Sequence, residues 1–341
     1  MSIDVIRGIA IAGILLINIS YFLNQAVQSG EPTGGDAVVW QLVDLLALGK
    51  FHFVFAFLFG TGVFIFLSRL RAKEGSLWVY VRRMIILFLA GVLNSALGGI
   101  DVLMSYGVLA LVLLGLTFLP RSVLVTVGVV LTLVPDALTL GASLGGSDGL
   151  PPALAALQFG RSLGHMALGY WLAERGLFSV GTRIPVKKVF YVALALSVPV
   201  WVWTLAAGTG TQQAHDIAFF TAMIPGLMYV TGLILLLRGA KAERALSFLR
   251  FYGRMAFSNY LGQTVICVTL LPVFASAGPK SASLGLGFCL AVVVFQCAFS
   301  VLWLRWFRYG PLEWVWRCGT YLEFAPLRIN DSRAAQQPGR R

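Results

Sequence analysis

Residues 5–18, VIRGIAIAGILLIN, form an apolar run interrupted by only two strongly polar side chains, Arg7 and Asn18. The run continues to residue 23, which is long enough for a helix that crosses a bilayer. Eleven residues at about 100° each return to within roughly 20° of the starting direction, so Arg7 and Asn18 share one helical face about 16 Å apart. The stretch therefore predicts a membrane helix with a shallow cation and a deeper amide on one stripe.

The composition of the whole chain is that of a membrane protein. Of its residues 58% are hydrophobic and 12% are charged, whereas soluble domains have roughly 25% charged residues. Apolar stretches of spanning length recur along the chain, and we expect an all-α polytopic bundle of about ten transmembrane helices. The stretches are 5–23, 51–70, 79–98, 102–119, 122–140, 153–174, 188–207, 216–237, 255–275 and 284–304.

The positive residues predict the orientation of the bundle. Nearly all Lys and Arg residues fall at one set of helix ends, and only Lys50, Arg161 and Lys280 fall at the other. The positive-inside rule then places both termini in the cytoplasm. This distribution accounts for the net charge of +12 without a nucleic-acid partner. We expect membrane lipids as partners.

The chain is expected to form a single membrane domain over 1–341. We divide it into a five-span half (1–140), an external Gly-rich connection (141–152), a second five-span half (153–304), and a cytoplasmic interfacial segment with a tail (305–341). A short amphipathic piece, 38–48, is expected to lie along the interface. The first stretch lacks a small-residue cleavage site and is treated as a retained helix. The four cysteines have no metal-ligand spacing, so no metal site and no disulfide framework are predicted.

Polar residues at the predicted external ends of three spans form the first candidate site. A neutral imidazole there, His165 or His52, could act as a general base on an alcohol or amine, and Arg161 or Lys50 could stabilise a developing oxyanion. Interhelical hydrogen bonding is the alternative role for each histidine. The candidate pocket consists of Lys50, His52, Asn94, Asp101, Arg161 and His165.

A second group lies at the predicted cytoplasmic ends of the last two spans. Asn259 and Gln263 are four residues apart and share a helical face. They could hold helices together, or bind a phosphate-bearing cofactor with the help of Arg7, Arg254 and Arg308, which lie at a similar depth. The full group is Arg254, Ser258, Asn259, Gln263, Gln296 and Ser300.

The stripe on the first helix also allows two interpretations. Arg7 could reach the lipid phosphates at the membrane surface, or it could face an anionic cofactor. Asn18 must find polar partners, because an amide in hydrocarbon is costly; these come from another helix or from a substrate.

Several stretches resemble the YeiB-like family of bacterial inner-membrane proteins of unknown function. They are DVIRGIAIAGILLINISYF, LVDLLALGKFHFVFAFLFGTG, IDVLMSYGVLAL, GRMAFSNYLGQTVIC and WLRWFRYGPLEWVWR. The last two are the most specific, and the likeness extends over nearly the whole chain. The family is similar to the transmembrane acyltransferases, chiefly in the first helix, where an Arg is followed at the eleventh position by His or Asn.

The resemblance implies transfer of an acyl group from cytoplasmic acyl-CoA, a co-substrate rather than a tightly bound cofactor, to an external glycan or lipid-linked acceptor. Arg7 would be the motif Arg, and Asn18 would occupy the distal motif position. The chain departs from the related enzymes in carrying Asn18, Ser29 and Asn94 where a His is expected. Its catalytic candidates are therefore His165, His52 and Asn18.

Two other classes of function use the same residues. A transporter or permease for a small polar or anionic solute would use the polar groups as a midplane site, and discontinuous helices would favour it. A non-catalytic scaffold is the third class. The motif Gly160-x-x-x-Gly164 would allow two helices to approach closely, as in a homodimer.

Overall fold

Every stretch predicted to span the membrane contains helix. The computed structural model describes residues 2–26, 34–100, 102–145, 152–179, 181–208, 211–275 and 281–329. The first helices are α1 (Ser2–Ala26), α2 (Gly35–Leu46), α3 (Lys50–Ala72), α4 (Trp78–Ala96), α5 (Leu103–Leu116), α6 (Arg121–Leu144), α7 (Pro152–Glu174) and α8 (Val186–Ala206). The remaining helices are α9 (Gln212–Phe220), α10 (Met223–Leu236), α11 (Ala240–Ala245), α12 (Ser247–Arg254), α13 (Ala256–Ala275), α14 (Ala282–Trp306) and α15 (Pro311–Tyr321).

The helices are those of a multi-pass membrane protein. Within the described ranges, 7 helical segments are long and apolar enough to cross a bilayer, or up to 8 if the bent pair α9 and α10 counts as one span. The helix α5 is apolar but shorter. The number of about ten spans and the cytoplasmic placement of both termini stay predictions.

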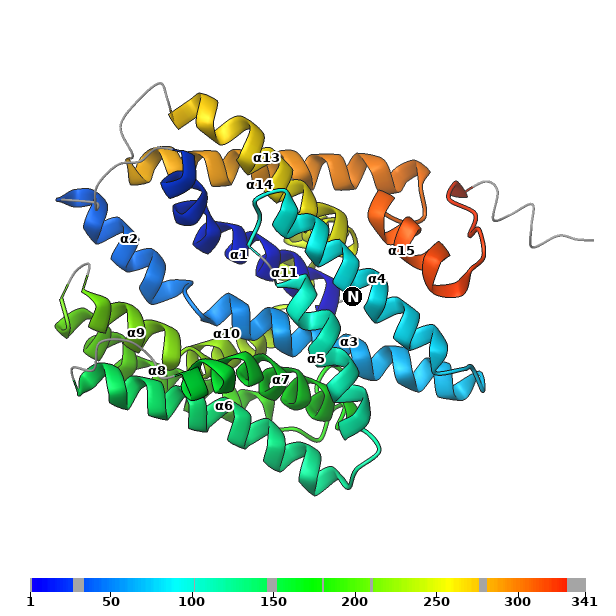
Figure 1. Ribbon diagram of the computed structural model, residues 1–341, viewed down its shortest axis with the longest axis horizontal. Helices are drawn as coiled ribbons and strands as arrows, with labels where there is room; N and C mark the ends of the chain where they lie inside the picture. Colours follow the sequence, from blue (N-terminus) through cyan, green and yellow to red (C-terminus); the bar gives the residue numbers. More distant parts are fainter. Residues whose placement is uncertain are drawn as a thin grey trace, which may run out of the picture.

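The helices are stacked in a fixed order across the bundle. Figure 1 shows α13 and α14 along one side, α6 along the opposite side, and α1 and α3 between them. Contacts between neighbours follow the same order, from α13 to α1, α3, α7 and α6. The first helix is thus central, and the buried side chains Ile6, Ile11 and Ile14 are fully covered.

Two glycines bring α3 and α7 into backbone contact. A Cβ at Gly60 would lie 1.9 Å from the Met166 carbonyl oxygen, and a Cβ at Gly169 would lie 2.0 Å from the Phe57 carbonyl oxygen. Thr61 Oγ1 also donates to the Gly169 carbonyl at 3.2 Å. Small residues at such a seam let dispersion forces and short polar contacts hold helices together in lipid.

The predicted helix-approach motif packs within the chain. A Cβ at Gly164 would lie 2.6 Å from Thr132 Oγ1 of α6, and one at Gly160 would lie 3.5 Å from Leu131. These glycines therefore serve the contact between α6 and α7. A homodimer stays a prediction, and this motif does not support it.

Helices are interrupted at two places, of which the first lies between the predicted piece 38–48 and the predicted span 51–70, and the two breaks meet. The break between α2 and α3 occurs at Gly49, whose φ is +71°. The pair α9 and α10, predicted as one continuous span over 216–237, bends by 50°. A Cβ at Gly49 would lie 2.6 Å from Ala222 Cβ and 2.9 Å from the Phe219 carbonyl oxygen. Only glycine fits this position, because it needs both positive φ and close approach.

The helix α15 lies across the end of the bundle where α1 begins, beside α4 (Figure 1). Glu313 Oε1 accepts hydrogen bonds from the backbone N–H groups of Phe257 and Ser258, at 2.8 and 3.1 Å. Ser258 Oγ donates to Glu313 Oε2 at 2.5 Å and accepts from the Leu312 N–H at 3.0 Å. The free N–H groups at the start of α13 and of α15 are thus satisfied by each other's side chains.

Candidate functional site

A buried lysine occupies the junction of the two helix breaks. Lys50 is fully buried, and its Nζ donates to the carbonyl oxygens of Ala218 at 2.8 Å and of Asp44 at 3.1 Å. Both carbonyls lie in the last turns of their helices, α9 and α2. The negative ends of two helix dipoles therefore face the ammonium group, which offsets part of the cost of burying it.

Beside this junction, Arg161 of α7 is fixed by two contacts. Its guanidinium forms a 3.0 Å ion pair with Asp136 of α6, in which the side chains are 11% and 10% exposed. The same guanidinium lies 4.1 Å from the centroid of the Phe219 ring. Arg161 also lies close enough to His52 and His165 to interact electrostatically with both. The structure thus brings together four residues of the predicted external pocket, Lys50 included.

Both histidines carry a buried ring nitrogen without a partner. His52 Nδ1 and His165 Nε2 have no hydrogen-bond partner among the described residues. The His165 ring is held edge-on against Phe53 at 4.9 Å, and the His52 ring lies 6.3 Å from Phe219. A buried polar atom normally has a partner, so these two nitrogens are free to bind a ligand or to accept a proton from one.

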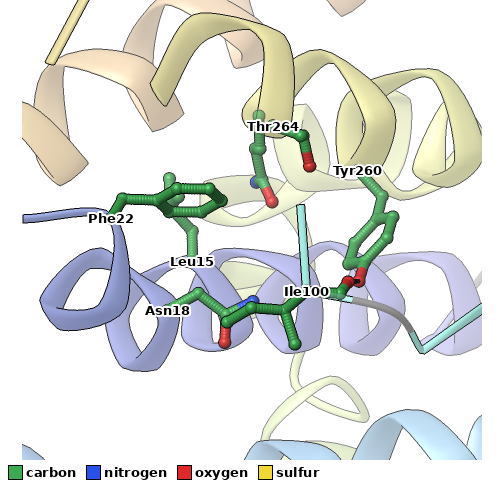
Figure 2. A pocket seen from close by; sticks show the side chains of 7 residues that line it. Leu15, Asn18, Phe22, Ile100, Tyr260 and Thr264 are labelled. Atoms are coloured by element: carbon green, nitrogen blue, oxygen red, sulfur yellow. Dashed lines mark hydrogen bonds between the residues drawn. The ribbon is translucent and has the colours of Figure 1, made fainter. Parts of the chain in front are cut away.

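A second site is a small cavity between α1 and α13, shown in Figure 2. The cavity has room for about one water molecule, because the volume within which the centre of that water can lie is about 10 Å³. Asn18 of α1 borders it opposite Tyr260 and Thr264 of α13 (Figure 2). The lining residues are Leu15, Asn18, Phe22, Ile100, Tyr260, Gln263 and Thr264.

Asn94 lies beside this cavity, in contact with Ile100, which lines it. Its Nδ2 donates to the Ile100 carbonyl at 3.1 Å, and the Tyr260 hydroxyl donates to the same carbonyl at 2.8 Å. Asn94 is fully buried, and its Oδ1 has no partner within the described part of the chain. A Cβ at Gly99 would meet both the Asn94 amide and Thr264. Of the two asparagines at expected histidine positions, Asn18 therefore borders the cavity and Asn94 holds the Ile100 segment beside it.

The predicted cytoplasmic amides form a closed hydrogen-bond network that reaches this cavity. Gln263 Nε2 donates to the Tyr252 hydroxyl at 2.8 Å, and Gln296 Nε2 donates to the Asn259 carbonyl at 2.9 Å. Asn259 Nδ2 donates to the Tyr252 carbonyl at 2.9 Å and to Ser300 Oγ at 3.1 Å. Asn259 and Gln263 therefore hold α12, α13 and α14 together, and Gln263 alone of the two borders the cavity.

The predicted cofactor arginines lie away from this network. Arg7 pairs with Asp4 at 3.1 Å, with its side chain 30% exposed. Arg254 donates to the Arg308 carbonyl at 3.1 Å, and the Arg308 guanidinium lies 5.9 Å from the Tyr309 ring. None of the three is joined by a hydrogen bond to Asn259 or Gln263 in the described structure, so the predicted five-residue cofactor group is divided.

Two positions named from the sequence, Asp101 and Ser29, lie outside the described residues. Asp136, the partner of Arg161, was not among the predicted site residues. A lone carboxylate in the apolar stretch VLTLVPDALTL was the available signal, because an acidic residue within a membrane span usually faces a partner or a ligand.

The histidine group and the cavity adjoin through one aromatic stack. The Phe55 ring lies 5.7 Å from the Tyr106 ring and 6.4 Å from the Tyr260 ring, close to parallel with both. Tyr260 lines the cavity, and Tyr106 lies within electrostatic range of Arg161. The rings of Tyr106, Phe55 and Tyr260 therefore form a continuous stack that ends at the cavity.

Comparison with known proteins gives consistent results. Residues 161–323 match the family described as "Protein of unknown function (DUF418)". The chain is 30% identical over 393 residues to "Uncharacterized protein YeiB" of Escherichia coli (strain K12), covering 98% of this chain and 99% of that protein. It is also 28% identical over 388 residues to "Uncharacterized protein YxaH" of Bacillus subtilis (strain 168), covering 95% of each.

Proposed function

The chain belongs to the YeiB-like family, and from this premise we propose that it is an acyltransferase of the bacterial plasma membrane. It would take an acyl group from acyl-CoA on the cytoplasmic side and deliver it to an external acceptor such as a glycan or lipid-linked molecule. The observation that carries the proposal is the polar cavity inside the bundle, bordered by Asn18 on the same helix as Arg7.

The chemistry assigns complementary roles to the two adjoining sites. Acyl transfer needs a donor that stabilises the oxyanion of the thioester carbonyl and a base that takes a proton from the acceptor. The Asn18 amide borders the cavity and can donate to the carbonyl oxygen. His165 Nε2 is buried and unpaired in the described structure, so it can take the proton.

The proposed transfer proceeds through a tetrahedral intermediate. The acceptor oxygen or nitrogen attacks the thioester carbon, and its proton passes to His165. The resulting tetrahedral oxyanion accepts a hydrogen bond from Asn18. The C–S bond then breaks, and the CoA thiolate leaves and takes up the proton from His165. Because the cavity has room for about one water, acceptor and thioester could meet there only if α1 and α13 separate and Phe55, which stacks between Tyr106 and Tyr260, rotates.

The test uses the full chain in proteoliposomes with acetyl-CoA labelled in the acetyl group and a panel of glycan acceptors. His165→Asn and Asn18→Ala are each expected to lower label transfer by about 100-fold or more. His215→Asn is the matched control, because His215 is an exposed imidazole that pairs with Asp44 at 3.4 Å. Absence of both CoA binding and label transfer in the wild-type protein would remove the proposal.

The paired helix breaks favour transport as a second candidate function. Transporters commonly bind solutes where discontinuous helices expose their ends, and here two broken helices meet at buried Lys50. In this alternative the site would carry a small polar or anionic solute. Uptake into proteoliposomes that is lost in Lys50→Met, with label transfer absent from the wild type, would favour transport over acyl transfer.

A further inference from the structure

Three buried polar side chains line the cavity between α1 and α13 without a full set of partners. Asn18, Gln263 and Thr264 each have 8% or less of their surface exposed. Neither the Asn18 amide nor the Thr264 hydroxyl forms a side-chain hydrogen bond within the described part of the chain. These two residues lie on opposite helices around the cavity (Figure 2). Buried polar groups are normally paired, so the cavity needs an occupant that they can bind.

The hydrogens of the other polar groups at the cavity are already used. Gln263 Nε2 donates to the Tyr252 hydroxyl at 2.8 Å and to Gln296 Oε1 at 3.3 Å. This orientation leaves Gln263 Oε1 without a donor among the described residues. The Tyr260 hydroxyl donates its proton to the Ile100 carbonyl at 2.8 Å. The lining therefore presents mainly oxygen atoms to an occupant.

Asn94 adds a further oxygen atom beside the cavity. Its Nδ2 donates to the Ile100 carbonyl at 3.1 Å, whereas its buried Oδ1 has no partner in the described ranges. A Cβ at Gly99 would lie 2.6 Å from Asn94 Nδ2 and 2.7 Å from Thr264 Oγ1. The Asn94 amide and the Thr264 hydroxyl thus flank the same glycine, and the excess of acceptors extends beyond the lining itself.

We infer that the cavity is a binding site for a small monovalent cation, such as sodium, held by the oxygen atoms of Asn18, Gln263 and Thr264. Neutral oxygens of this kind replace the hydration shell of monovalent ions in channels and transporters. Divalent ions usually bind carboxylates, and no carboxylate lines the cavity among the described residues. The inference does not rest on the proposed function, because the lining groups need an occupant whatever reaction the protein performs.

An ion in this position would join α1 to α13, because its ligands come from both helices. A ligand that binds only the folded protein raises its stability as the ligand concentration increases. The test follows thermal unfolding of the full chain in detergent while sodium chloride replaces choline chloride at constant total salt. Choline is too large for a cavity with room for about one water. The unfolding midpoint is expected to rise with sodium and to level off at saturation, and a parallel series in potassium chloride shows which small ion binds better.

Substitutions at Asn18 are expected to change the sodium response in opposite directions. Asn18→Asp places a negative charge beside the ion and should lower the sodium concentration at half-saturation by about tenfold or more. Asn18→Leu and Thr264→Val each remove a ligand and should abolish the sodium effect. Asn24→Asp and Thr269→Val are the matched controls, because both residues are exposed on the same two helices.

A wild-type midpoint that is the same in sodium, potassium and choline would overturn the inference and identify the occupant as water. Asn18→Asp would then only lose stability, because its buried carboxylate would have no counter-charge. A gain of sodium affinity in Asn18→Asp cannot come from misfolding, so the test stays decisive even if Asn18→Leu does not fold. Sodium binding without acyl transfer would overturn the proposed function and leave this site intact, whereas transfer without a sodium effect would do the reverse.

Discussion

Ser258 and Glu313 join two helices by capping both of their first turns. The Glu313 carboxylate accepts from two N–H groups of α13 and from the Ser258 hydroxyl, while Ser258 Oγ accepts from the Leu312 N–H of α15. Replacement of a capping residue by Ala usually costs about 0.5–2 kcal/mol. Because Glu313→Ala removes the acceptor for three donors, we expect a loss near 2 kcal/mol. Thermal unfolding in detergent measures it, with Glu323→Ala, an exposed residue, as the control.

The same carboxyl group makes stability depend on pH. Burial raises the pKa of Glu313 above its ordinary value of 4.5, and the hydrogen bonds from Ser258 and Phe257 oppose the rise. A raised pKa in the folded state means that the folded protein binds the proton more tightly than the unfolded chain does. The contribution of this group is therefore full below pH 4.5 and is lost as the pH rises through the folded-state pKa. Unfolding of wild type and Glu313→Gln across this range is expected to show a steeper fall for the wild type; equal slopes would contradict it.

The ion pair between Arg161 and Asp136 predicts an asymmetric mutational response. Removal of one partner leaves a nearly buried charge without compensation, which typically costs about 3–5 kcal/mol. Asp136→Leu is therefore expected to destabilise the fold strongly. The double variant Asp136→Leu/Arg161→Met removes both charges and is expected to recover most of the stability. Chemical or thermal unfolding of all three proteins decides the matter, and additive losses would show that the pair is not coupled.

The backbone contact between α3 and α7 predicts a sharp contrast between two glycines of one helix. A Cβ at Gly60 would overlap the Met166 carbonyl, whereas a Cβ at Gly62 would meet nothing within 4 Å. We expect Gly60→Ala to cost about 3 kcal/mol or more through overpacking. Gly62→Ala is expected to be neutral or stabilising by about 0.5–1 kcal/mol, as for glycine in a helix interior. Similar melting temperatures for the two variants would contradict the close contact.

The cavity at Asn18 offers a test of the resemblance to acyltransferases. Those enzymes carry Arg followed at the eleventh position by His or Asn, and here Asn18 occupies the distal position. If the cavity is the reaction centre, the substitution Asn18→His adds a proton acceptor to it, in addition to His165. We expect measurable acyl transfer in Asn18→His and in the wild type, with loss in Asn18→Leu. Activity that survives in Asn18→Leu would place the chemistry elsewhere.

The hydrophobic pattern predicted the helical class because each span is encoded locally. The stretches at 5–23 and 284–304 were predicted to span the membrane, and they correspond to the helices α1 and α14. The boundary between the piece 38–48 and the span 51–70 was predicted, and the break at Gly49 falls between them. The bend after Phe220 was not predicted, because the sequence remains apolar on both sides of it and only the contact with Gly49 shows why the helix stops there.

The candidate sites could be predicted in part from the sequence. His52, Arg161 and His165 were grouped because all three were assigned to similar depths of neighbouring spans, and the structure places them close together. Asn94 was grouped with them for the same reason, yet it donates to the Ile100 carbonyl and packs beside Gly99. Depth follows from position along a span, whereas the direction in which a side chain faces depends on how helices are rotated and packed, which one sequence does not encode locally.

The glycine seam between α3 and α7 also constrains how the protein can move. Where two backbones touch, a shift of one helix along the other would drive carbonyl groups into Cα atoms, so α3 and α7 must travel as one rigid body. Any opening that admits a ligand to the interior therefore has its pivots at other helix contacts. Lys50 and His52 belong to α3 and His165 belongs to α7. The distances among these three residues are therefore preserved while the surrounding helices rearrange.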